Sequence, residues 1–232
     1  MRATTLRKRI WRGAATAVLF AAASLPAFAE TPDTGGLAVA ARISTLGLGL
    51  ELVAPLSQRL NFRVAGAIGG LNYNDTQGDV DYKVDARLRT GAALLDWHPA
   101  GGGFRFSAGA MYNGNELEGE ARPRTATEIG DIKFSPEEIG TLRAAVEFPA
   151  LAGYVGIGFG NAAARGNRWT VLFDIGAMIH AAPEFTLSAD GSKSGHPMFQ
   201  RELDKERNRI ESDYVRLARF FPVVSLGLGF RF

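Results

Sequence analysis

The chain has 232 residues, of which 46% are hydrophobic, 10% aromatic and 22% charged. This composition excludes an intrinsically disordered chain, and the density of charges excludes a helical protein that crosses a membrane several times. The 28 glycines favour many glycine-punctuated strands over helices. The absence of cysteine excludes disulfides, thiol catalysis and cysteine-ligated metals.

The first thirty residues have the pattern of a secretory leader. Five basic residues precede an apolar run from Gly13 to Leu25, and Ala27-Phe28-Ala29 forms a cleavage box. The apolar run is about thirteen residues long, whereas a membrane-spanning helix needs roughly twenty. We therefore predict a signal peptide over 1–29, cleaved near Ala29, and a mature domain over 30–232. The leader holds five basic and no acidic residues, so the mature chain is slightly acidic and gives no argument for nucleic acid.

Most of the mature chain alternates apolar and polar residues with a period of two. From Val224 to Phe232 every second residue is apolar, and similar stripes occupy 60–68, 82–88 and 169–175. Such stripes predict strands with one apolar and one polar face. Alternation alone fits a soluble sandwich as well as a membrane barrel.

Three further features favour a barrel. The chain is exported without cysteine, its strands are long, and short connections (55–58, 99–103, 160–167) alternate with longer loops (74–79, 122–140, 189–219). Aromatic residues also fall near strand ends, as interfacial girdles would: Trp97, Phe104 and Trp169 near short turns, and Tyr82, Tyr112 and Phe185 toward long loops. A lipid-exposed sheet cannot keep a free edge. We therefore predict an all-β fold, an antiparallel transmembrane β-barrel.

The number of strands depends on a change of phase between Ser44 and Leu46. Apolar residues occupy odd positions from Leu37 to Ile43 and even positions from Leu46 to Leu52. This change indicates either a bulge in one long strand or a tight hairpin between two short ones. We favour the hairpin, because an even number of strands puts both ends of the barrel in the periplasm. The eight strands are then expected near 36–44, 46–54, 59–73, 80–98, 103–121, 141–160, 168–188 and 220–232.

One long loop departs from the strand pattern. Leu203, Ile210 and Leu217 recur every seven residues among many charged residues. This spacing predicts a loop helix over about 198–218 with a narrow apolar stripe. The helix either rests on the barrel rim or serves as a lid or a partner-binding helix.

The last strand carries a second signal. Phe230 and the terminal Phe232, with alternating apolar residues before them, resemble the signal that the barrel-assembly machinery recognises. Over almost the whole mature chain the organisation resembles the small eight-stranded outer-membrane barrels of the OmpA-like, OmpX-like and OmpW-like group. The runs that resemble a sparsely characterised proteobacterial branch of this group are 45–52, 96–99, 101–105, 112–115 and 222–225. The resemblance implies a fold and an outer-membrane location. It does not imply one function, because the group includes tethers, adhesins, candidate small-solute channels and a few enzymes.

The residues of the mature chain give little support for a catalytic site. The mature histidines are His98, His180 and His196, and none has the Ser and carboxylate partners of an activated nucleophile. No two of them share a strand face or a helix turn, which argues against a metal site. We expect no catalytic residue, no metal and no cofactor.

The charged residues on the polar faces of the strands are the best candidates for a functional site. By phase, the side chains expected to point into the lumen are Arg42, Glu51, Arg63, Asp81, Lys83, Asp85, Arg87, Arg89, Arg105, Arg143, Glu147, Asp174 and Arg231. Both signs are present, so we expect these groups to pair across a narrow lumen and form a polar core. Gly153, Gly156, Gly158 and Gly160 are interpreted as small lumen residues beside them. The alternative is a narrow polar path in which the excess of basic residues favours anions.

These patterns predict an integral outer-membrane barrel with a binding, adhesion or envelope-structural role. A narrow small-solute channel that favours anions is the alternative, and a lipid-modifying enzyme is the third possibility. The expected partners are the lipid bilayer, the barrel-assembly machinery and an extracellular ligand or surface partner, but not nucleic acid.

Overall fold

The computed structural model describes residues 35–166, 168–211 and 219–232. The predicted signal peptide lies outside these residues and stays a prediction. The described elements are β1 (Ala38–Ser44), β2 (Gly47–Ser57), β3 (Leu60–Gln77), β4 (Val80–Trp97), β5 (Arg105–Asn113), β6 (Glu116–Pro123), β7 (Thr127–Ile129), β8 (Ile132–Phe134), α2 (Pro136–Ile139), β9 (Leu142–Glu147), β10 (Leu151–Phe159), β11 (Trp169–His180), β12 (Glu184–Ala189), α3 (Pro197–Ile210) and β13 (Phe220–Arg231).

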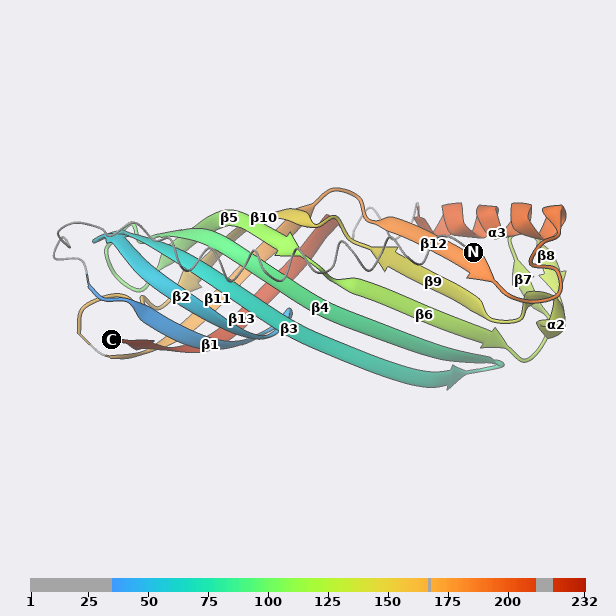
Figure 1. Cartoon of the computed structure of the whole chain (residues 1–232), viewed down its shortest axis with the longest axis horizontal. Helices are drawn as coiled ribbons and strands as arrows, with labels where there is room; N and C mark the ends of the chain where they lie inside the picture. The colour runs from blue at the N-terminus through green and yellow to red at the C-terminus, as the bar shows by residue number, and fades with distance from the viewer. Residues whose placement is uncertain (1–34, 167, 212–218) are drawn as a thin grey trace, which may run out of the picture. The chain divides into compact units, whose positions relative to one another are not determined.

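Eight of these strands form a closed antiparallel ring (Figure 1). Their order is β1-β2-β3-β4-β5-β10-β11-β13, and β13 returns to pair with β1. Closure gives each strand of the ring a partner on both sides, which a lipid-exposed sheet requires. The predicted eight-stranded barrel is confirmed. We call the end of the ring with the connections 58–59, 98–104 and 160–168 the turn end.

The change of phase after Ser44 is a tight hairpin. Ser44 pairs with Gly47, so that Thr45 and Leu46 form a two-residue turn between β1 and β2. Gly47 has a φ of 104°, and a Cβ atom there would lie 2.1 Å from the carbonyl oxygen of Ile68. Only glycine fits both requirements. The hairpin is therefore confirmed and the bulge is excluded.

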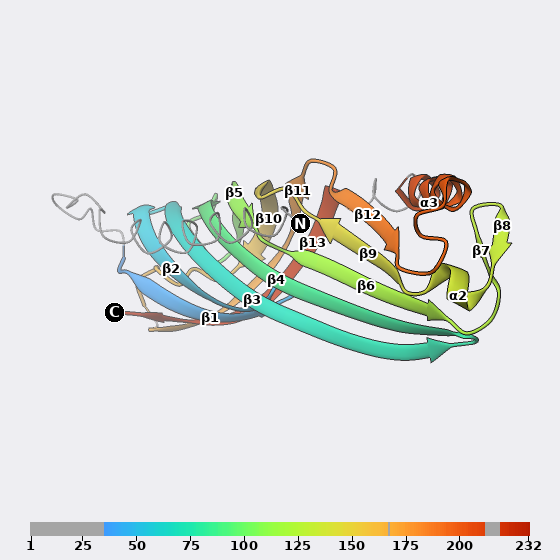
Figure 2. The ribbon, with the colours of Figure 1, turned by 45° about the vertical axis from the view of Figure 1, so that its right-hand side comes forward.

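The sheet continues beyond the ring. β3 and β4 have 18 residues each, and β4 pairs with β5 through its second half and with β6 through its first half. β9 and β12 follow β6 in order. We call residues 69–77 and 80–88, together with β6, β9 and β12, the extension sheet; it runs to the right of the ring in Figures 1 and 2.

Three of the strands expected from sequence are each two strands. Segment 103–121 forms β5 and β6, 141–160 forms β9 and β10, and 168–188 forms β11 and β12. The breaks fall near Gly114, Pro149 and Pro183; proline removes a ladder donor. The expected loop at 74–79 is also wrong. Gln77 pairs with Val80, which leaves a two-residue turn.

The β7–β8 hairpin, α2 and α3 lie together at the far end of the extension sheet (Figure 2). They bury Ile129, Phe134, Ile139, Phe199 and Leu203 together. Partly buried side chains of β9 and β12 pack against this group, which we call the loop core.

The loop helix differs from its prediction in its buried face. α3 is described from Pro197 to Ile210, whereas the expected continuation to about residue 218, with Leu217, lies outside the described residues and stays a prediction. Its buried residues are Phe199, Glu202 and Leu203, a spacing of three and four that places them on one face. The helix therefore packs on the loop core rather than on the rim of the ring. The seven-residue spacing missed this because it did not include Phe199.

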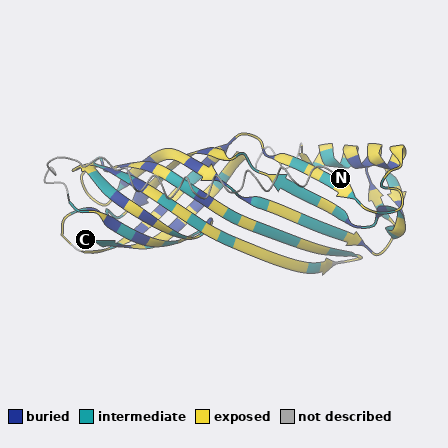
Figure 3. Cartoon of the chain, in the orientation of Figure 1, coloured by how far each residue is buried: buried dark blue, intermediate teal, exposed yellow. Residues whose placement is uncertain are grey.

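Large apolar side chains cover the outside of the ring. Ile43, Leu48, Ile68, Val171 and Leu226 are each more than half exposed, and exposed and buried residues alternate along the strands in Figure 3. A soluble monomer rarely exposes so extensive an apolar surface, whereas a membrane barrel presents one to lipid. Within the described residues, no helix is both long and apolar enough to cross a membrane.

Candidate functional site

Six charged side chains meet inside the ring, and we call them the charge cluster: Arg42, Glu51, Arg63, Asp96, Arg105 and Asp174. Nε of Arg42 lies 2.6 Å from Oε2 of Glu51, and Nη1 of Arg63 donates to the same oxygen at 3.3 Å. All of these side chains are at most 9% exposed. The cluster contains three arginines and three carboxylates, so its formal charge is zero.

Asp174 is the most connected carboxylate of the charge cluster. Nη2 of Arg105 lies 2.8 Å from both of its oxygens, Arg42 donates a short hydrogen bond to it, and Nη2 of Arg63 lies 3.7 Å away. Asp96 accepts from Nη2 of Arg63 at 2.9 Å and from Oγ of Ser107 at 2.5 Å. Such dense pairing offsets part of the cost of taking charges out of water.

Glycines make room for the charge cluster. A Cβ atom on Gly158 would lie 2.5 Å from Oδ1 of Asp174, and one on Gly227 would lie 2.7 Å from Cγ of Arg42. Gly153 differs from the expectation, because β10 alternates and places Gly153 on the exposed side. The glycines of β10 and β13 that face inward thus fix where long charged side chains can lie.

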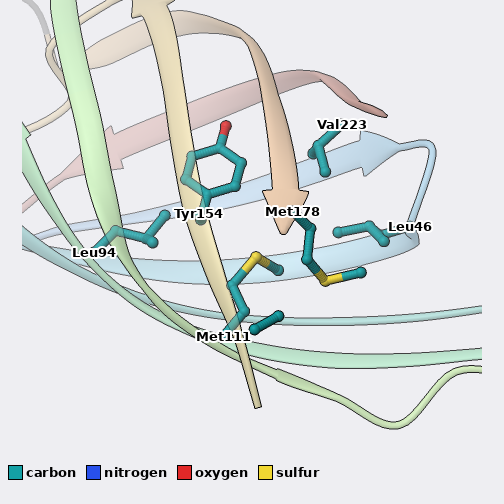
Figure 4. Packing of buried hydrophobic residues seen from close by; sticks show 7 residues of the cluster. Leu46, Leu94, Met111, Tyr154, Met178 and Val223 are labelled. Atoms are coloured by element: carbon teal, nitrogen blue, oxygen red, sulfur yellow. The ribbon is translucent and has the colours of Figure 1, made fainter. Parts of the chain in front are cut away.

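An apolar layer lies inside the ring on the side of the extension sheet. It consists of Leu46, Leu94, Met111, Ala152, Tyr154, Met178 and Val223, all of which except Ala152 are labelled in Figure 4. Leu46 was expected on the outer face with Leu48 and Leu50, but it turns inward at the β1–β2 hairpin and is buried. A cavity of about 70 Å³ lies between this layer and the charge cluster, lined by Tyr154 and Arg42 among others.

The turn end of the ring is closed as well. The connection 160–168 places Ala162 and Ala163 against Ala38, Ala40, Val53 and Leu172, and we call this group the floor. The amide of Gly36 donates to the carbonyl of Ala163 at 3.1 Å. Side chains therefore fill the ring from the floor through the charge cluster to the apolar layer.

The structure brings together five of the thirteen residues expected in the lumen, namely Arg42, Glu51, Arg63, Arg105 and Asp174. Arg231 lies at the turn end, where Nη2 donates to the carbonyl of Gly166. The other seven do not join the cluster. Six belong to the extension sheet, and Arg89 follows it directly on β4: Asp81, Lys83, Asp85, Arg87, Arg89, Arg143 and Glu147.

Their position follows from the unbroken alternation of β4. Lys83, Arg87 and Arg89 share a face with Leu95 and Trp97, which point away from the interior. Where β4 extends beyond the bilayer, its outer face contacts water instead of lipid, so the residues on that face are polar. The residues on the inner face of the same segment are apolar. The phase of the polar residues therefore reverses along one strand.

Asp96 completes the charge cluster, although it is not among the thirteen residues predicted to point into the lumen. Taking the charged phase of 81–89 as the inward one places residue 96 on the wrong side. The available signal was local, because Asp96 is a lone carboxylate between Leu95 and Trp97, which are both exposed and apolar.

The extension sheet presents two different faces. Cross-strand partners share a face, so its inner face carries Leu71, Tyr73, Tyr82, Val84, Ala86, Leu88, Leu117, Ala121, Leu142, Ala144, Val146, Phe185, Leu187 and Ala189. The loop core covers Leu142, Leu187 and Ala189. Leu71 remains 63% exposed and Tyr73 49% exposed. The extension sheet thus offers an apolar face that the described residues cover only at one end.

The three histidines have structural contacts. Nδ1 of His98 lies 2.9 Å from the carbonyl of Gly102 and its Nε2 lies 3.2 Å from Asn61, while Nδ1 of His180 lies 2.8 Å from the carbonyl of Ala181. His196 accepts from the amide of Met198 at the start of α3. Among the described side chains, no group of three or more metal ligands is present.

Comparison with known proteins identifies solved structures that have the same fold. No protein-family model and no curated protein matches the chain. The crystal structure of Acinetobacter baumannii CarO superposes with a TM-score of 0.61 at 18% identity, covering 88% of this chain and 100% of that chain. The chain has the fold of a small outer-membrane β-barrel. The A. baumannii CarO2 structure agrees, with a TM-score of 0.60 at 19% identity over 85% of this chain and 98% of that chain. At these identities the likeness shows the fold alone.

Proposed function

We propose that this outer-membrane barrel acts in binding, adhesion or envelope architecture, and that it neither conducts solutes nor catalyses a reaction. The filling of the ring carries this proposal. An eight-stranded ring is just wide enough for side chains to fill it, and here the floor, the charge cluster and the apolar layer occupy successive levels.

The charges inside the ring argue against the anion-favouring channel. Selectivity for anions needs an excess of basic groups along the path. The charge cluster holds equal numbers of both signs, and each carboxylate lies within 3.3 Å of an arginine nitrogen. An entering anion would therefore have to displace a buried ion pair.

The inner face of the extension sheet is the proposed binding surface. In outer-membrane barrels the short turns face the periplasm and the long connections face outward, which places the extension sheet and the loop core outside the cell. Exposed apolar patches of this kind mark interaction sites on soluble surfaces. Leu71, Tyr73 and Tyr82 are the side chains that a partner would cover.

The route to this location rests on the two ends of the chain. The predicted signal peptide supplies export. Phe230 and Phe232 lie 5.6 Å apart between ring centroids, on the outer side of the last strand. They are the residues that the barrel-assembly machinery would contact.

A surface-display experiment tests the binding role. A Gram-negative host displays the wild-type protein, the inner-face variant Leu71→Asp/Tyr73→Asp, or the outer-face control Asn72→Asp/Asn74→Asp on the same strand. We expect the wild type and the control to increase adherence of cells to protein-coated plates or to each other, and the inner-face variant to lose this gain. Equal adherence of wild type and empty host would contradict the proposal.

A further inference from the structure

Among the described side chains at the turn end of the ring, the charges are of one sign. The connections at this end and the end of the last strand contain four described arginines, namely Arg59, Arg165, Arg168 and Arg231. The same segments, 55–60, 98–104, 160–168 and 229–232, contain no Asp or Glu. We call these four residues the arginine rim. Arg59, Arg165 and Arg168 are exposed, and Arg231 is half-buried.

The arginine rim is not a consequence of composition. The chain has 26 basic and 24 acidic residues, so the two signs are nearly balanced overall. The described carboxylates lie either in the charge cluster, as Glu51 does, or at the other end of the molecule, on the extension sheet and the loop core. The described carboxylates are therefore confined to the interior of the ring and to the end opposite the arginine rim.

The arginine rim lies within a girdle of aromatic rings. Arg168 precedes Trp169, whose ring centroid lies 4.9 Å from that of Phe230, and Arg231 stands between Phe230 and Phe232. The amide of Arg231 donates to the carbonyl of Arg168 at 2.9 Å, which holds the two residues side by side. Aromatic girdles mark the level of lipid headgroups, so the neighbouring guanidinium groups are at that level too.

We propose that the arginine rim binds the phosphate groups of anionic phospholipids in the leaflet at the turn end; this inference rests on the proposed membrane role. Guanidinium groups match phosphate oxygens in charge and in planar geometry, and basic residues at a membrane surface recruit anionic lipids. An anionic glycan beyond the bilayer would also match the charge. The girdle favours the lipid, because it places the arginines among headgroups.

Tryptophan quenching by brominated lipids tests this proposal at the site itself. The mature chain has two tryptophans, Trp97 and Trp169, and Trp97→Phe leaves the one beside Arg168. The protein is folded into phosphatidylcholine vesicles that contain an equal, low fraction of either brominated phosphatidylglycerol or brominated phosphatidylcholine. We expect the anionic lipid to quench Trp169 about two-fold more strongly, with the preference falling at high salt.

A matched pair of variants separates the arginine rim from charge in general. Arg165→Gln/Arg168→Gln should equalise quenching by the two lipids, whereas Arg87→Gln/Arg201→Gln, which removes two exposed arginines from the other end, should leave the preference intact. If the rim variant does not fold, the salt titration of the Trp97→Phe protein still decides, since loss of preference with salt requires a charge contact.

Two results would overturn the proposal. One is equal quenching by both lipids; sedimentation with peptidoglycan that needs the same arginines would then assign them to the glycan. The other is a preference for the anionic lipid that survives both high salt and the rim variant. Failure to enter vesicles, judged by the absence of heat-modifiable migration on gels, would instead contradict the membrane barrel on which the inference rests.

Discussion

Arg105 and Asp174 meet inside the barrel, with Nη2 of Arg105 2.8 Å from each carboxylate oxygen of Asp174. Both side chains are 3% exposed. The two residues come from β5 and β11, which are neighbours of β10 on opposite sides, and Gly158 of β10 leaves the space between them open. One ion pair thus joins two strands of the ring across a third.

Replacing Asp174 by asparagine should destabilise the barrel strongly. The substitution leaves three buried arginines facing two carboxylates, and breaking such a pair costs about 3–5 kcal/mol. Urea unfolding of the protein in lipid vesicles measures the effect. The control is Asp85→Asn on the outer face of the extension sheet, which should change little. Equal unfolding midpoints for the two variants would show that the charge cluster contributes no stability.

Adding one methyl group at Gly158 should be harmful, whereas the same change at Gly153 should be tolerated. The new Cβ atom at residue 158 would lie 2.5 Å from Asp174, while the nearest atom to one at residue 153 is 3.9 Å away. Overpacking of this kind costs about 1–3 kcal/mol. Refolding yield and unfolding midpoint of Gly158→Ala and Gly153→Ala report the difference; matching values would contradict the packing described here.

Leu226→Arg should impair insertion far more than Thr186→Arg. Leu226 is 53% exposed on the outside of the ring, where an arginine near the bilayer midplane costs about 2–4 kcal/mol. Thr186 lies on the outer face of the extension sheet, away from the ring. The folded fraction in vesicles, taken from heat-modifiable migration, is the measurement. Similar folded fractions would mean that the apolar belt does not face lipid.

The loop core should loosen in acid. Glu202 accepts from Nζ of Lys205 at 2.9 Å and from the amide of Asp131, and these hydrogen bonds lower the pKa of Glu202 below its usual value. A carboxyl with a lowered pKa contributes stability above its unfolded pKa and loses it as pH falls through the folded value. The protection factors of the α3 amides, which remove the pH dependence of the intrinsic exchange rate, should therefore fall in that range.

Glu202→Gln provides the control for this pH effect. The amide keeps the shape of the side chain but cannot titrate, so α3 should exchange faster at neutral pH and lose most of its acid sensitivity. An unchanged acid sensitivity in Glu202→Gln would assign the effect to another group, for example Asp131, whose pKa is also lowered by Lys205.

The sequence predicts the ring well, because alternation and turn chemistry are local. The phase change between Ser44 and Leu46 led directly to the β1–β2 hairpin. What alternation cannot tell is which face of a strand is inside once the strand leaves the bilayer. β4 runs without a bulge from Val80 to Trp97, yet its polar residues change sides between Arg89 and Asp96.

The apolar contents of the ring were equally hard to foresee. Met111, Met178 and Leu94 follow the alternation of their strands, but their hydrophobicity suggests the lipid side. Their inward position is a tertiary property, since the ring narrows the space to one that side chains from several strands fill together. The splitting of β5 from β6 likewise depends on which neighbour each half finds.

Single-channel recording of the refolded protein in planar lipid bilayers shows whether the ring is closed by its own side chains. For a preparation shown to be folded by its heat-modifiable migration, we expect a current no different from that of a protein-free bilayer. Stable current steps with a preference for anions would contradict it, and the channel interpretation would then replace the binding one.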